Sequence, residues 1–264
     1  ITIPAGVLNV SITLSSVDDL LDELNETVVI DVDTVINGTE LVAQSRTVTI
    51  LDNSVSPTVT LDVGALSVSE PSTVTTVTAT LSAVSALQVT VTLAKSGTAT
   101  EGSDYTLGGE IVIPAESASA LISLTVLNDT LNETNESVII DIGSVTNGTE
   151  SGTQQKTVTI LDNDPLPTVT LSVVAGAIAE TGGTKLVTAS LSGASSLDVT
   201  VTLSKSGTAT EGATNDYTLG NTILITASNT SASITLTSVG DLLDETDETV
   251  VVDIASVTNG TENG

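Results

Sequence analysis

Acidic residues recur in this chain with a fixed spacing that suits a metal ion. Each copy has an Asp, a Glu four residues later and a second Glu three residues after that. Closely spaced carboxylate oxygens are the ligands that calcium takes, about six to eight at a time. The copies therefore predict calcium sites, with acidic residues at Asp19, Glu23 and Glu26, at Asp129, Glu133 and Glu136, and at Asp241, Glu245 and Glu248.

The acidic copies lie about one domain length apart. From Asp19 to Asp129 is 110 residues, and from Asp129 to Asp241 is 112 residues. Other phrases recur at the same offset. Val-Thr-Val-Thr-Leu, for example, begins at Val89 and again at Val199. A period this long indicates a folded domain that is repeated, and not a short solenoid repeat.

The repeat divides the chain into three units. Residues 58–167 form a complete repeat, residues 1–57 match the second half of a repeat, and residues 168–264 form a repeat that lacks its last strand. Incomplete end units would leave open sheet edges. We therefore expect the chain to be a window on a longer array.

Alternating apolar and polar residues predict strands throughout the complete unit. Val, Ile and Thr dominate the alternating segments, and Gly, Ser, Asn and Pro separate them. About seven short strands in one repeat indicate an all-β fold made of tandem immunoglobulin-like antiparallel β-sandwiches. The expected strands are 58–63, 74–81, 88–93, 110–113, 120–127, 137–142 and 156–161.

The composition excludes several classes of protein. The chain has 33 acidic and 5 basic residues and a formal net charge of −28, which argues against nucleic acid as a partner. It has no Cys and no His, so disulfides, thiolate metal sites and the commonest general base are absent. No apolar run approaches the roughly 18 residues of a membrane span. An enzyme is the least expected class, because nothing in the sequence breaks the repeat to make a substrate cleft.

Several phrases, taken in order, resemble the Calx-beta domain. They are Gly-Thr-Ala-Thr-Glu-Gly-Ser-Asp-Tyr from Gly97, the acidic phrase from Asp129, and Thr-Val-Thr-Ile-Leu-Asp-Asn-Asp from Thr157. The family is named for the calcium-binding domains of sodium–calcium exchangers and also occurs in tandem in large extracellular adhesion proteins. The resemblance implies calcium bound where loops converge at one end of each sandwich.

The resemblance also implies a set of calcium ligands in each unit. Asn128, Asn163, Gly240 and Ser54 replace acids of the richest family members, so we expect one or two ions per domain. A solvated acidic loop without an ion is the alternative. The implied ligands are Glu70, Asp104, Asp129, Glu133, Glu136, Asp162 and Asp164 in the complete unit, Glu180, Asp216, Asp241, Glu245 and Glu248 in the third, and Asp19, Glu23, Glu26 and Asp52 in the first.

Three functions remain open at this point. The first is a calcium-stiffened stalk in a large extracellular adhesin or surface filament, because near-identical units on short Pro-containing connectors favour length. The Thr- and Val-rich, Cys-free composition resembles that of surface adhesins of Bacteroidota, some of which are used in gliding. The second is a regulatory calcium sensor. The third is a module that binds surface glycans or proteins, against which the single Arg and the absence of Trp argue.

Overall fold

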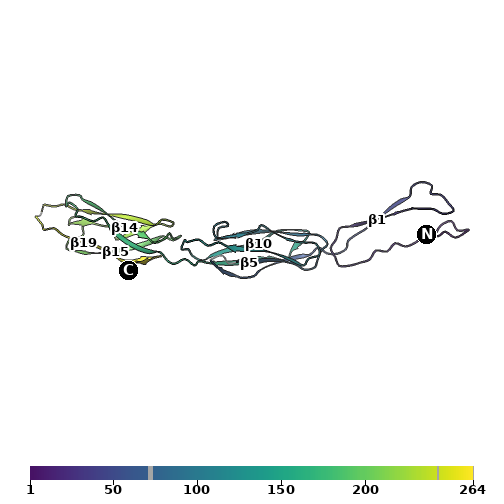
Figure 1. The fold of residues 1–264 in the computed structure, drawn as a ribbon, viewed down its shortest axis with the longest axis horizontal. Helices are drawn as coiled ribbons and strands as arrows, with labels where there is room; N and C mark the ends of the chain where they lie inside the picture. The colour runs from purple at the N-terminus through teal and green to yellow at the C-terminus, as the bar shows by residue number, and fades with distance from the viewer. Residues whose placement is uncertain (71–73, 243, 264) are drawn as a thin grey trace.

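The chain is a row of three β units. A computed structural model describes residues 1–70, 74–242 and 244–263. Figure 1 shows the units end to end along one axis, with the N-terminal unit in purple and the third unit in green and yellow. The described residues contain strands and no helix, which confirms the all-β, tandem sandwich prediction.

The middle unit consists of two five-stranded sheets packed face to face. One sheet has the strand order β4-β12-β10-β6-β8 and the other has the order β11-β3-β5-β9-β7. Neighbours are antiparallel except at two edges, where β4 pairs with β12 and β11 with β3 in parallel. The strands are β3 (Thr58–Val63), β4 (Ser67–Ser69), β5 (Val74–Leu81), β6 (Val89–Gly97), β7 (Tyr105–Leu107), β8 (Glu110–Ile113), β9 (Ser119–Val126), β10 (Glu136–Thr146), β11 (Thr149–Glu150) and β12 (Lys156–Leu161).

The seven expected strands of this unit are present, and three further strands are not among the predictions. The missed strands β4, β7 and β11 have three residues or fewer, too short to display an alternating pattern. Strands β6 and β10 run further than expected. Their ladder continues through polar residues such as Lys95, and it passes a register shift between Ile142 and Ser144.

An aliphatic core fills the space between the sheets. Along β5, alternate residues from Thr75 to Leu81 are buried, and their neighbours are more exposed. Val59, Val77 and Ile140 are fully buried. This period-2 burial is what a strand with one face on the core requires.

The third unit repeats one sheet and part of the other. Its sheets have the orders β16-β18-β14-β13-β20 and β17-β15-β19. Residues 174–183, which correspond to the region of β4, form no strand. The strands are β13 (Thr168–Val173), β14 (Thr184–Leu191), β15 (Val199–Gly207), β16 (Tyr217–Thr218), β17 (Thr222–Ile225), β18 (Ser231–Ser238), β19 (Val250–Thr258) and β20 (Thr261–Glu262).

The first unit contains one antiparallel pair. Strand β1 (Glu26–Asp31) pairs with β2 (Ser45–Ile50) along its whole length. Val29 and Ile30 stay exposed, at 62% and 47%. Residues 1–57 are all described, and they form no second sheet over this hairpin.

Each unit meets the next through the same pair of positions. At the first joint, the Ser85 hydroxyl donates to the Asp22 carboxylate at 2.8 Å, and the Ala86 amide donates to the Asp22 carbonyl at 3.0 Å. At the second, the Ser195 hydroxyl donates to Asn132 Oδ1 at 3.3 Å, and the next amide donates to the Asn132 carbonyl at 2.9 Å. The four side chains are buried, so these contacts are shielded from water.

Candidate metal centre

A glycine brings the first acidic loop of the middle unit into place. Gly97 has a φ of +125°, and a Cβ at this position would lie 2.1 Å from the Ser137 carbonyl oxygen. That carbonyl accepts hydrogen bonds from the amides of Thr98 and Ala99 at 3.0 and 3.1 Å. Only a residue without a side chain permits this approach. The loop is thereby held against the start of β10, where Glu136 lies.

Two backbone hydrogen bonds bring further acids to the same end of the sandwich. The Leu127 amide donates to the Asp104 carbonyl at 2.9 Å, which ties Asp104 to the end of β9, just before Asp129. The Glu70 amide donates to the Leu161 carbonyl at 3.2 Å. Glu70 therefore lies beside the end of β12, where the exit acids follow.

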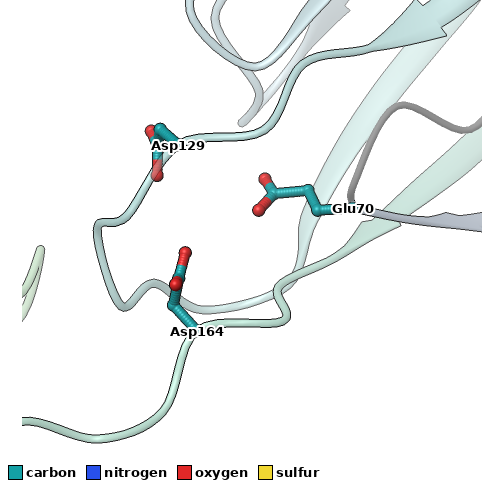
Figure 2. Close-up of side chains that lie close together, drawn as sticks. All are labelled: Glu70, Asp129 and Asp164. Atoms are coloured by element: carbon teal, nitrogen blue, oxygen red, sulfur yellow. The ribbon is translucent and has the colours of Figure 1, made fainter.

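Six of the seven predicted ligands of the middle unit gather in two groups. Within each group, every residue offers a carboxylate oxygen, and these oxygens all lie within 4.8 Å of one another. Figure 2 shows the three side chains of the first group pointing from separate segments into one space. The first group is Glu70, Asp129 and Asp164, and the second is Asp104, Glu133 and Glu136.

Several of these oxygens are buried without a partner in the protein. Glu70 Oε2, Asp162 Oδ1 and Asp164 Oδ2 accept no hydrogen bond from the residues that the structure describes. Glu70 as a whole is only 8% exposed. An unpaired buried carboxylate is unfavourable, and a hard divalent cation satisfies several such oxygens at once. The donor set therefore fits calcium.

The crowding of like charges raises the carboxyl pKa values. Burial, followed by the charges of Asp129, Asp162 and Asp164, raises the pKa of Glu70 to about 7. Burial and a hydrogen bond to Asp104 raise the pKa of Glu136 to about 7. Each shift means that the folded protein disfavours the charged form, and a bound cation would reverse that preference.

Two asparagines hold the exit segment in the site. Asn132 Nδ2 donates to the Asp164 carbonyl at 3.0 Å and contacts Asp162 Oδ2 at 3.5 Å. The Asp162 amide donates to Asn135 Oδ1 at 3.2 Å. Asp162 thus lies at the site without belonging to either group of three. Neither asparagine was among the predicted residues, although both lie inside the repeated acidic phrase.

The third unit has two groups that share one residue. Glu180, Asp241 and Glu245 form one, and Asp216, Glu245 and Glu248 form the other, again within 4.8 Å. All are exposed except the half-buried Asp216. Desolvation, followed by the charges of Asp241, Asp216 and Glu180, raises the pKa of Glu245. This site is more open to water than the one in the middle unit.

The predicted ligands of the first unit are near one another but not gathered. Asp19, Glu23, Glu26 and Asp52 line one pocket together with Asp18. Desolvation, followed by the charges of Asp19, Glu26 and Asp52, raises the pKa of Glu23. In residues 1–57, which are all described, no three carboxylates come within 4.8 Å of one another. Their role as ligands stays a prediction.

Comparison with known families decides the identity of the repeat. The family model of the Calx-beta domain matches residues 52–164 and 167–264. The chain belongs to the Calx-beta family. Calx-beta domains are calcium-binding modules, and calcium is the cofactor of this chain. That the acidic groups described above hold the ion stays a prediction.

Solved structures of other proteins are similar to this chain. One is described as the crystal structure of CBD12 from CALX1.2, with 18% identity, a TM-score of 0.34, and coverage of 72% of this chain and 77% of that one. Another is the calcium binding domain CBD12 of CALX1.1, with 18% identity, a TM-score of 0.35, and coverage of 74% and 78%. A search of the curated proteins finds no match. The family assignment comes from the family model alone.

Among the residues that the structure describes, no helix has the length and apolarity needed to cross a membrane.

Proposed function

We propose that this chain is a calcium-stiffened stalk segment of a large extracellular adhesin or surface filament. The observation that carries the proposal is the position of Asn132. This residue lies inside the acidic phrase, between Asp129 and Glu133. Its amide group donates to the Asp164 carbonyl, and its own oxygens accept hydrogen bonds from the following unit, at Ser195 and the next amide. One side chain thus connects the calcium site to the joint.

Two of the predicted calcium ligands face the joint. A pocket between the middle and third units is lined by Asp129 and Asp164 on one side and by residues 192–194 on the other, with the connector residues 165–167 between them. An ion held by Asp129 and Asp164 would fix the acidic loop to the exit segment. Because the same loop carries Asn132, the ion would also fix the orientation of the next unit.

The connector leaves little slack for bending. Pro165 and Pro167 restrict its backbone. Immediately after it, the Thr168 amide donates to Ser192 Oγ at 2.9 Å, and the Ser192 amide donates back to the Thr168 carbonyl at 2.9 Å. Without calcium, the exit acids repel one another and Glu70, and we expect the joint to loosen.

The extracellular setting is part of the proposal. Sites with several exposed carboxylates suit the weak affinities that extracellular modules use at millimolar calcium. A calcium sensor would use the same groups but would need the two units to change orientation when the ion binds. In this reading, glycans or proteins bind to other parts of the larger molecule, and the neighbours of this segment are further repeats of its own chain.

Small-angle X-ray scattering on the whole chain tests the proposal. We expect a longer maximum dimension and a narrower distance distribution in calcium than in chelator. Sodium chloride added to the chelator should not restore them, because salt screens long-range repulsion but does not coordinate carboxylates. Three identical scattering curves would overturn the stiffened stalk. A compact, differently oriented calcium form would favour the sensor.

A further inference from the structure

A lysine in the third unit is placed against an amide and a carboxylate. Lys205 lies in β15, and its side chain is only 9% exposed. Its Nζ forms an ion pair with Glu211 and donates to the Leu219 carbonyl at 2.7 Å and to Asn221 Oδ1 at 2.7 Å. The Leu203 amide also donates to the Asn221 carbonyl at 2.8 Å, so the backbone holds Asn221 beside β15.

The middle unit has the same arrangement without the amide. Lys95 Nζ pairs with Glu101 at 2.5 Å and donates to the Leu107 carbonyl at 2.9 Å. The Leu93 amide donates to the Gly109 carbonyl at 2.8 Å, so Gly109 stands where the third unit has Asn221. The lysine, the glutamate and the backbone contacts therefore do not need the amide. Its presence in the third unit calls for a separate explanation.

We propose that Lys205 and Asn221 become joined by an intramolecular isopeptide bond, with Glu211 transferring the protons. The Lys205 ammonium first gives a proton to the Glu211 carboxylate. The neutral Nζ then attacks Cγ of the Asn221 carboxamide. The Nζ–Cγ bond forms, the Cγ–Nδ2 bond breaks, and Glu211 returns its proton to the departing nitrogen.

The atoms and charges of this reaction balance without a further reactant. A lysine ammonium and an asparagine amide become one secondary amide and one ammonium ion. No electron is transferred, and the groups involved are all in this chain. The second proton that Nζ loses goes with the leaving nitrogen.

The geometry supplies the proximity that such a step needs. Nζ is 2.7 Å from Oδ1 and therefore adjacent to Cγ, which carries that oxygen. Holding a nucleophile next to its target raises the effective concentration by many orders of magnitude. The neighbouring pairing of β15 with β17, which includes Thr202 opposite Thr222, holds both partners in register.

The bond would enclose the loop that carries Asp216. This loop runs from β15 to β17 and includes Glu211 and the buried Tyr217. A covalent link between Lys205 and Asn221 would restrict the conformations that the loop can adopt. The inference does not depend on the stalk proposal, because it concerns contacts inside one unit.

Intact mass spectrometry of the denatured whole chain tests the proposal. Loss of ammonia should lower the measured mass by about 17 Da relative to the sequence. Two variants should restore the full mass of their sequences. Asn221→Gly copies the residue of the middle unit, and Glu211→Gln removes the proton carrier but keeps the size of the side chain.

Trypsin locates the change. An unmodified chain is cut after Lys185 and after Lys205, whereas a chain linked through Nζ is cut after Lys185 but not after Lys205. We therefore expect one fragment spanning 186–264 that carries the whole mass deficit. A wild-type chain at full mass would overturn the proposal. So would a deficit in a chain that is still cut after Lys205, because an imide at an Asn-Gly sequence such as Asn147 loses the same mass.

Discussion

Replacing Glu70 by Gln separates the cost of charge crowding from the benefit of calcium. Glu70 is buried, one of its oxygens has no partner among the described residues, and its pKa is raised to about 7. Gln has nearly the same size but no charge. We expect Glu70→Gln to stabilise the calcium-free middle unit at neutral and alkaline pH and to reduce the stabilisation that calcium provides.

The sign and size follow from the raised pKa. The folded middle unit holds the Glu70 proton up to about pH 7, whereas the unfolded chain releases it near 4.5. Stability from this group is therefore fully present below about pH 4.5 and is lost as the pH rises through about 7. The loss amounts to about 3 kcal/mol at about pH 8. The Gln variant does not titrate there, so it should exceed the wild type by a similar amount in chelator.

Urea unfolding followed by tyrosine fluorescence measures this effect. The chain has two tyrosines and no Trp, so a Tyr217→Phe background leaves Tyr105 as the reporter of the middle unit. Each protein is unfolded near pH 4.5 and near pH 8, in chelator and in calcium. Calcium at a hundredfold excess over Kd should stabilise the wild type by about 2.7 kcal/mol. The Gln variant should gain clearly less stability from calcium than the wild type does.

A matched control removes the same charge elsewhere in the unit. Asp141 lies in β10, and its carboxylate accepts a hydrogen bond from the adjacent Ile142 amide at 2.9 Å. Asp141→Asn should leave both the pH dependence and the calcium gain close to wild type. Two results would contradict this expectation. One is a Glu70→Gln variant that is less stable than the wild type in chelator near pH 8, and the other is a variant that gains as much stability from calcium as the wild type.

Further predictions concern the loop, the ligands and the third unit. Gly97→Ala should destabilise the middle unit by roughly 3 kcal/mol in the same urea assay, because the new Cβ meets a carbonyl, while Gly109→Ala, with open space around it, should change little. Asp129→Ala and Glu133→Ala should each weaken calcium binding in calorimetric titration more than Asp141→Ala; equal losses would mean that net charge alone matters. The same titration of the wild type should resolve weaker sites in the third unit, whose carboxylates are more exposed, and a single class of sites would contradict this.

The alternating pattern was enough to predict the long strands. Residues 58–63, 74–81, 110–113 and 156–161 are strands at the expected bounds. Strand β4 could not be predicted from local sequence, because its three residues form a strand only by pairing with β12. Strand β12 lies about ninety residues further along the chain. That pairing also places Glu70 in the site. The family resemblance pointed to Glu70 as a ligand, but no local pattern shows what surrounds it.

The acidic repeat by itself determined the kind of chemistry. Oxygen ligands without Cys or His select a hard cation, and a period of about 110 residues selects a domain as the repeating unit. Period-2 alternation determined that the domain is a sandwich, because alternation is a local property that each strand displays alone.

Only the tertiary structure decided which side chains meet. Asn132 faces Ser195 across a joint, and Lys205 meets Asn221 across a sheet. These contacts depend on the strand order and on the packing of one unit against the next. They join residues that are far apart in the sequence, so no local sequence pattern predicts them. The family resemblance implied the ligands of the middle unit, but their division into two groups comes from the fold. The burial that leaves one Glu70 oxygen without a hydrogen-bond partner among the described residues also comes from the fold.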